Sequence, residues 1–128
     1  MNAQLEKYNV VSFSGGRTSA YMIHRIQTMV SQGLIKNVKY VYMDTGAEHP
    51  KTYDFIRQVV KHFGIDLVCL RSVMTTEVGV GATWRQISID DICDDYGPWK
   101  DMMKCYSTPT IKMPMCTDRM KTAPYLKY

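Results

Sequence analysis

Short apolar runs alternate with longer segments of helical periodicity in the first half of the chain. Residues 8–14 (YNVVSFS), 38–44 (VKYVYMD) and 66–70 (DLVCL) are rich in β-branched and aromatic residues, which favours strands. Between them, residues 17–32 and 50–63 carry apolar side chains at intervals of three and four, which favours amphipathic helices. Strands and helices that alternate in this way build a parallel sheet with right-handed crossovers. The sequence therefore predicts a βαβαβ core and an α/β fold.

The ends and the buried faces of both helices can be predicted. Gly33 and Gly64 follow the helices where a left-handed residue often ends one, and Pro50 suits a first turn. The strands are nearly continuous apolar runs, as expected for a sheet covered on both faces. The side chains predicted to face the sheet are Met22, Ile23, Ile26, Met29 and Val30 in the first helix, and Tyr53, Ile56, Val59, Val60 and Phe63 in the second.

The whole chain of 128 residues fits a single domain, residues 1–128. Its core is residues 8–71, and residues 72–128 form a loop-rich C-terminal part. In that part we expect loops at 74–83 and 107–116, a helix or a strand at 84–93, a short helix at 97–105, and a last helix at 117–128 that Thr117 caps.

Composition excludes several classes of protein. Apolar residues make up 45% and charged residues 22%, which does not suit a disordered chain or a coiled coil. No apolar run approaches the ~20 residues that cross a bilayer, and the N-terminus lacks the apolar region of a signal peptide. We therefore expect a cytoplasmic protein without membrane contact. The net charge of +4 suits an anionic ligand, but the basic residues are scattered, so nucleic acid is not indicated.

The four cysteines, Cys69, Cys93, Cys105 and Cys116, contain no CxxC pair. A zinc ribbon or a thioredoxin-type motif is therefore not expected. In a cytosolic chain the thiols should be reduced. Cys69 lies in a predicted strand and should act as a small core residue.

The strongest local signal for a ligand is residues 12–19 (SFSGGRTS), between the first strand and the first helix. The start of a helix offers unpaired N–H groups and a partial positive charge. Two glycines let the backbone approach an anion, and hydroxyl groups and an arginine add donors. The next strand ends at Asp44, on the edge of the sheet where α/β proteins bind ligands. The alternative is a plain strand-to-helix turn with glycine for geometry and serine as a cap.

Four segments resemble one superfamily. SFSGGRTS resembles the PP-loop, SGGxxS, of the adenine nucleotide α-hydrolase-like superfamily. Residues 43–55 (MDTGAEHPKTYDF) are similar to the DTG…E.P.T..F segment of the phosphoadenylyl sulfate (PAPS) reductase family, and residues 116–124 to its C…K..P segment. Residues 96–99 (YGPW) resemble an element of its short members, many of them phage-encoded. The resemblance implies a three-layer sandwich with a mainly parallel sheet of about five strands, abbreviated here.

The resemblance also implies a role for each matching residue. Lys121 matches a basic residue that faces the substrate anion, and Thr52 would lie near the loop. Arg17 and Lys121 are the candidates for stabilising charge on phosphorus oxygens. The phosphate or sulfate would be cradled by Ser12, Ser14, Gly15, Gly16, Arg17, Thr18 and Ser19, and the adenine and ribose would be flanked by Met43, Asp44 and Thr45.

Three departures from the family limit the expected chemistry. Arg17-Thr18 replaces the usual Lys-Asp of the loop, which removes a candidate magnesium ligand, so a role for Mg²⁺ stays open. Cys116-Thr117 replaces a Cys-Cys pair, so no iron–sulfur cluster is expected. The C-terminal tail that carries the catalytic cysteine of the reductases is not expected either. We expect binding of ATP or a related adenine nucleotide, with cleavage at the α-phosphate if the chain is an enzyme. The alternative is a non-catalytic member that binds a nucleotide or a protein, for example a phage factor that binds a host protein.

The remaining polar and sulfur-containing residues support weaker predictions. Glu48 is expected to cap the second helix rather than to contact ribose. For His49, a contact with phosphate or ribose and the absence of any such contact are equally favoured. A solvated face is favoured over a metal site for Asp90, Asp91, Asp94 and Asp95. A homodimer is expected to cover the sheet edges. A partner surface is slightly favoured over core filling for Met102, Met103, Met113, Met115 and Met120.

Overall fold

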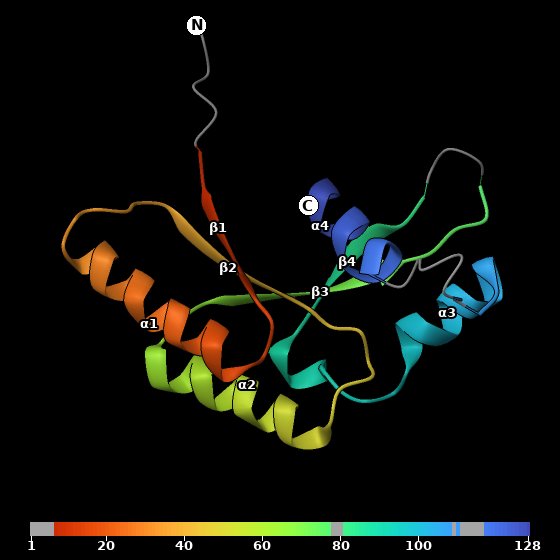
Figure 1. Cartoon of the computed structure of the whole chain (residues 1–128), viewed down its shortest axis with the longest axis horizontal. Helices are drawn as coiled ribbons and strands as arrows, with labels where there is room; N and C mark the ends of the chain where they lie inside the picture. The colour runs from red at the N-terminus through yellow and green to blue at the C-terminus, as the bar shows by residue number, and fades with distance from the viewer. Residues whose placement is uncertain (1–6, 78–80, 109, 111–116) are drawn as a thin grey trace, which may run out of the picture.

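The computed structural model describes residues 7–77, 81–108, 110 and 117–128 (Figure 1). A 3₁₀ turn at Ile89–Asp91 precedes α3, and a π-helical turn at Asp118–Thr122 leads into α4. The elements in chain order are β1 (Asn9–Phe13), α1 (Arg17–Ser31), β2 (Val38–Met43), α2 (Pro50–Phe63), β3 (Leu67–Val73), β4 (Thr83–Ile87), α3 (Gly97–Tyr106) and α4 (Ala123–Lys127).

The described strands form one sheet in the order β1-β2-β3-β4. β1, β2 and β3 are parallel, and β4 runs antiparallel to β3. Phe13 pairs with Tyr42 in the register, and Tyr42 pairs with Cys69. The α/β fold with a mainly parallel sheet is thus confirmed. The segment at 84–93, left open between helix and strand, contains β4 and the 3₁₀ turn.

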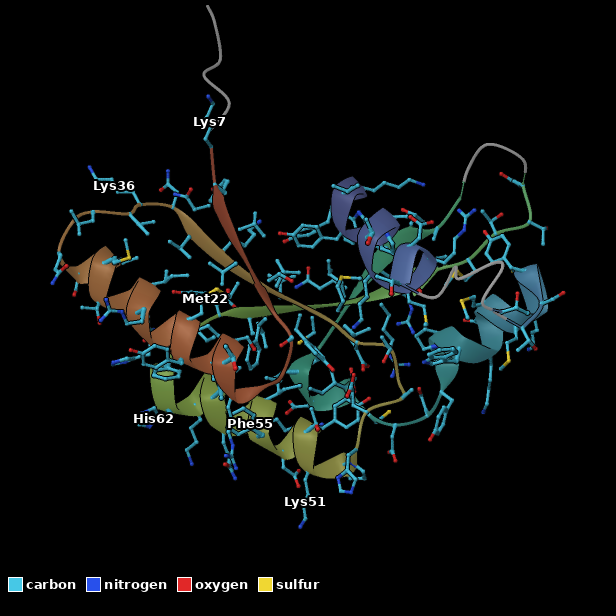
Figure 2. The ribbon with its side chains drawn as sticks, in the orientation of Figure 1. Lys7, Met22, Lys36, Lys51, Phe55 and His62 are labelled. Atoms are coloured by element: carbon cyan, nitrogen blue, oxygen red, sulfur yellow. The ribbon has the colours of Figure 1, made fainter. Side chains whose placement is uncertain are left out.

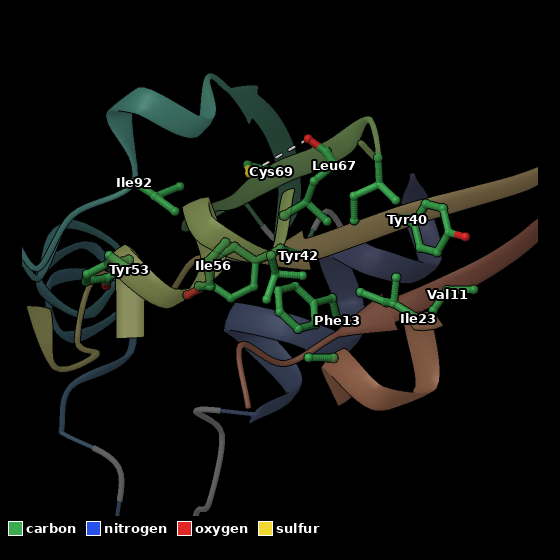
Figure 3. Close-up of a cluster of buried hydrophobic side chains, with 13 residues drawn as sticks. Val11, Phe13, Ile23, Tyr40, Tyr42, Tyr53, Ile56, Leu67, Cys69 and Ile92 are labelled. Carbon is green, nitrogen blue, oxygen red and sulfur yellow. Dashed lines mark hydrogen bonds between the residues drawn. The ribbon is translucent and has the colours of Figure 1, made fainter. Parts of the chain in front are cut away.

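The main hydrophobic core lies between the sheet and the two long helices. Figure 1 shows α1 and α2 side by side on one face of the sheet. Alternate residues of the strands point to this face, where the side chains in Figure 3 pack together. Its members include Val11, Phe13, Tyr40, Tyr42, Leu67 and Cys69 from the strands and Ile23, Tyr53, Ile56 and Val59 from the helices.

The predicted buried face of α1 is partly wrong. Ile23 is fully buried and Ile26 packs against the core, but Met22, Met29 and Val30 are exposed. The contact face is rotated toward α2, where Ala20 is buried and the Gln27 side chain donates a hydrogen bond to the Phe63 carbonyl at 2.9 Å. The stripe of α2 was predicted correctly, and Gly64 ends that helix in the left-handed conformation.

The C-terminal segment covers part of the opposite face of the sheet and makes the third layer. Val41, Met43 and Leu70 are buried there, with Trp84, Tyr125 and Tyr128 packed against them. The Trp84 indole donates a hydrogen bond to the Lys127 carbonyl at 3.1 Å. The segment begins as a π-helical turn, and Thr117 makes no side-chain capping bond, so the predicted cap is wrong.

The described sulfur-containing side chains divide between the core and the surface. Met102 and Met120 are buried, whereas Met103 is exposed; Met113, Met115 and Cys116 lie outside the described residues. Burial raises the pKa of the Cys69 thiol to about 12, so this side chain is a neutral core residue. Within the described ranges, no helix is long and apolar enough to span a membrane.

The corrected face of α1 can be tested by truncating one residue on each side of the helix. We expect Ile23→Ala to lower the free energy of unfolding by about 2–5 kcal/mol, because it leaves a cavity against the sheet. Met29→Ala should change it by about 0.5 kcal/mol or less, as is usual for surface residues. Urea denaturation measures both values. Similar losses for the two variants would contradict this packing.

Candidate functional site

The loop between β1 and α1 requires glycine at one position. Gly15 has φ = +85°, a conformation that side chains rarely adopt. A β-carbon on Gly15 would lie 3.1 Å from Ile56 Cδ1 and 3.2 Å from Thr52 Cγ2. The first turns of α2 therefore fix the position of the loop, and Thr52 lies against it.

Two serines hold the loop in shape. The Ser19 hydroxyl donates to the Gly16 carbonyl at 3.0 Å and accepts from the Ser14 N–H at 3.3 Å. Ser14 Oγ lies 2.9 Å from Ser19 Oγ. Because a hydroxyl has one proton and Ser19 donates it to Gly16, Ser14 is the donor between the two serines. The hydroxyl protons thus stay within the loop.

The N-terminus of α1 is open to a ligand. Its N-cap residue, Gly16, makes no side-chain capping bond, and the first turn contains no acidic residue. The first N–H groups of a helix have no acceptor inside the helix and carry a partial positive charge. These backbone groups, with the exposed Arg17 beside them, suit an anion.

A cavity of about 230 Å³ lies next to this loop. The C-terminal segment reaches across the sheet to close it, so that Lys121 lines the same cavity as Ser12 and Ser14. One part of the lining is polar, and the other part is apolar and aromatic. The remaining lining residues are Phe13, Tyr42, Met43, Glu48, Thr122, Tyr125 and Leu126.

The other predicted site residues do not line this cavity; they are Gly15, Gly16, Arg17, Thr18, Ser19, Asp44, Thr45, His49 and Thr52. Thr18 is exposed on the first turn of α1, and Thr45 is buried beside Asp44. His49 is exposed, and its Nδ1 accepts a hydrogen bond from the Lys51 N–H at 3.1 Å. His49 is therefore the cap of α2. The prediction that Glu48 caps this helix is wrong, since Glu48 instead lines the cavity.

Asp44 is fully buried and its carboxylate is committed to internal contacts. Oδ1 accepts from the Gly46 N–H at 3.1 Å and from the Tyr53 hydroxyl at 3.2 Å. Oδ2 accepts from Arg71 Nε, and Arg71 Nη2 lies 2.8 Å from the same oxygen. Asp44 thus shapes the turn after β2.

Arg71 joins three segments at the carboxyl end of the sheet. Nη1 contacts Asp95 Oδ2 at 2.9 Å, and Nη2 donates to the Cys93 carbonyl at 3.1 Å. Burial alone would lower the pKa of Arg71, but the hydrogen bonds to Asp95 and Asp44 outweigh it and raise this pKa above its ordinary value. In turn, the hydrogen bond from Arg71 lowers the pKa of Asp95 to about 2. Arg71 and Asp95 therefore both carry their charges at neutral pH.

The four aspartates at 90–95 thus have two different roles. Asp90, Asp91 and Asp94 are exposed, as predicted, while Asp95 holds Arg71 and also accepts from the Gly97 N–H at 2.9 Å. Among the residues that the structure describes, no group of three His, Cys, Asp or Glu side chains is arranged to hold a metal ion.

The sequence contained signals for some cavity residues that were not predicted. Tyr125 follows Lys121 by four residues, so a helix places both on one face. Tyr42 lies two residues before Asp44 of the DTG segment and pairs in register with Phe13, which precedes the loop. No sequence signal indicated Leu126.

A second cavity, of about 440 Å³, lies between the outer sides of α1 and α2. Its lining includes Tyr21, His24, Phe55 and His62, of which Figure 2 labels the last two. None of the residues that the sequence assigned to a ligand lines this cavity.

Fold and loop together define a class of protein. The chain is an α/β protein whose first parallel strand ends in a glycine–serine loop at an uncapped helix N-terminus. The phosphoadenosine phosphosulfate reductase domain family matches residues 8–108, so the chain belongs to this family. The resemblance drawn from the sequence motifs is thereby confirmed.

Curated relatives agree with this assignment. The uncharacterized nin region protein ORF290 of Escherichia phage lambda is 46% identical over 123 residues, which is 94% of this chain and 42% of the relative. The phosphoadenosine 5'-phosphosulfate reductase of Thiocapsa roseopersicina is 28% identical over 85 residues, 64% of this chain and 34% of that enzyme. The chain thus spans less than half the length of these relatives. No solved structure matches it.

The ion pair between Asp44 and Arg71 can be tested by removing its basic partner. We expect Arg71→Leu to lower the free energy of unfolding by about 3–5 kcal/mol, because Asp44 remains as a buried charge without a counter-ion. The double variant Asp44→Asn with Arg71→Leu should recover part of this loss. Arg85→Leu is the matched control, because Arg85 is the register partner of Arg71 on the neighbouring strand and is exposed. If Arg71→Leu and Arg85→Leu cost the same in urea denaturation, the assigned role of Arg71 is wrong.

Proposed function

We propose that the chain binds an adenine nucleotide or sulfonucleotide in the cavity beside the β1–α1 loop. The observation that carries this proposal is the position of Lys121, which lines one cavity with Ser12 and Ser14 although it is more than 100 residues away in sequence. A cation thus lines the same cavity as Ser14, the loop residue that leads into the uncapped N-terminus of α1. Both favour a phosphate or sulfate group.

The rest of the cavity suits the nucleoside part of such a ligand. Met43, Tyr125 and Leu126 give it an apolar and aromatic lining. A purine ring is flat and largely apolar on its faces, and cavities of this kind bind such groups. The name of the Thiocapsa relative, a phosphoadenosine phosphosulfate reductase, supports an adenine-containing ligand.

Binding is the part of the expected function that the geometry supports best. If the ligand is cleaved at its α-phosphate, Lys121 would stabilise the developing charge, with Arg17 at the start of α1 as a second cation. A non-catalytic member of the family would use the same cavity for binding. The test below therefore measures affinity rather than turnover.

Lys121→Met tests whether the C-terminal segment completes the site. Methionine keeps the apolar stem and removes the charge. We expect the Kd for ATP or for PAPS to rise roughly 10- to 150-fold, as for a lost charge-assisted hydrogen bond. Calorimetric titration measures it. Lys36→Met is the control, since Lys36 lies in the α1–β2 connection, away from the cavity (Figure 2).

The outcomes distinguish failure of ligand binding from failure of the role assigned to Lys121. If neither compound binds the wild-type protein, the proposed function is wrong. If one binds but Lys121→Met has unchanged affinity, the anion is held by the loop alone. A similar loss in Lys36→Met would indicate a general effect of net charge rather than a contact.

A further inference from the structure

Tyr42 has a buried hydroxyl group that nothing in the described structure satisfies. The residue lies on β2, lines the cavity and is only 2% exposed. Its hydroxyl oxygen has no hydrogen-bond partner among the described residues. A buried hydroxyl without a partner costs free energy, because it has lost its bonds to water. Such a group calls for an explanation.

Packing explains the ring of Tyr42 but not its hydroxyl. The ring lies among apolar side chains beside Ile56 and Phe13 (Figure 3), with 6.4 Å between the Phe13 and Tyr42 ring centroids. A phenylalanine would fill this place equally well. The core on this face of the sheet therefore does not require the oxygen atom.

Unlike Tyr42, the nearby Tyr53 has a hydroxyl group with hydrogen-bond partners. Its hydroxyl donates to Asp44 Oδ1 at 3.2 Å and accepts from the Glu48 N–H at 3.3 Å. Asp44 in turn is bound by Arg71. The polar groups around Tyr53 are thus already paired with one another, whereas Tyr42 remains outside this network.

The Tyr42 phenol is a hydrogen-bond donor at neutral pH. Burial is the main cause that raises its pKa far above the ordinary value, and the nearby Asp44, Tyr53 and Glu48 raise it further. The proton therefore stays on the oxygen. A protonated phenol of a residue that lines a cavity can donate to an acceptor that enters the cavity.

The strand register places Tyr42 beside the end of β1, from which the β1–α1 loop starts. Tyr42 is the register partner of Phe13, and the next residue in the chain, Ser14, begins the loop. The Tyr42 side chain belongs to the core on the α1 and α2 face. Tyr125, by contrast, packs on the opposite face. Tyr42 therefore lies on the face of the sheet that α1 covers, and Tyr125 lies on the other face.

We propose that the Tyr42 hydroxyl donates a hydrogen bond to a phosphate or sulfate oxygen of the ligand bound in this cavity. This inference rests on the proposed function. It assigns a specificity-determining contact to a residue within the core, in addition to Lys121 and the loop. Binding of the ligand then satisfies a group that is unsatisfied in the free protein.

Tyr42→Phe tests the inference first in the absence of ligand. Tyr40→Phe is the matched control, because Tyr40 lies two residues earlier on the same strand and face and does not line the cavity. We expect the Tm of Tyr42→Phe to equal or exceed that of the wild type. A fall of about 3 °C or more relative to Tyr40→Phe would show a hydrogen bond in the free protein and would overturn the inference.

The second arm measures affinity for ATP and for PAPS by calorimetry. Tyr42→Phe should raise the Kd of the compound that binds about 10-fold or more, and Tyr40→Phe should leave it unchanged. If the wild type binds and Tyr42→Phe binds equally well, the inference on Tyr42 is wrong while the proposed function stands. If the wild type binds neither compound, both are wrong.

Discussion

The ion pair between Asp44 and Arg71 is the interaction on which the carboxyl end of the sheet depends. Asp44 is fully buried and Arg71 nearly so, and a buried charge is tolerated only when it is paired and hydrogen-bonded. Their contacts extend to Tyr53 on α2, to Gly46 in the turn after β2, and to Asp95 before α3. These contacts thus fix four segments to one another: β3, α2, the turn after β2 and the segment before α3. The position of Glu48, which lines the cavity, follows from this arrangement.

The cavity is assembled from residues on the two faces of the sheet. The β1–α1 loop belongs to the face that α1 and α2 cover, and Thr52 and Ile56 hold its glycine in place. Lys121 and Tyr125 come from the C-terminal segment on the other face, which Trp84 and Tyr128 anchor to the sheet. Neither layer forms the cavity alone. This explains how a loop near the N-terminus and a lysine near the C-terminus come to face one space.

The sequence predicted the parts of the fold that depend on local pattern. Strand and helix order, the stripe of α2 and its end at Gly64 all follow from apolar periodicity and from glycine. The buried face of α1 was not predicted correctly, because the apolar stripe of this helix is wider than the surface that it packs against. Met22 and Met29 fit the helical spacing of apolar residues and yet are exposed. Thr117 failed as a cap because the chain is already helical there and the π-helical turn follows.

For the candidate site, motifs predicted the loop and Lys121, and Ser12, Ser14 and Lys121 line one cavity, but motifs could not assign tertiary partners. Asp44 matches a motif position and yet faces inward, because Arg71, 27 residues later, pairs with it. His49 caps α2 in the place predicted for Glu48, since its Nδ1 reaches the Lys51 N–H. The role of Tyr42 depends on the absence of a partner for one hydroxyl among the described residues, which only coordinates can reveal.

An NMR titration of the ¹⁵N-labelled protein with ATP and with PAPS tests the central claim, that the cavity between the loop and the C-terminal segment is the ligand site. The account predicts the largest amide shifts at residues 14–19, at the N-terminus of α1, together with shifts at residues 121–126. No amide shift with either compound would contradict it. Shifts confined to the groove between α1 and α2, around Tyr21, His24 and His62, would contradict it equally and place the ligand in the second cavity.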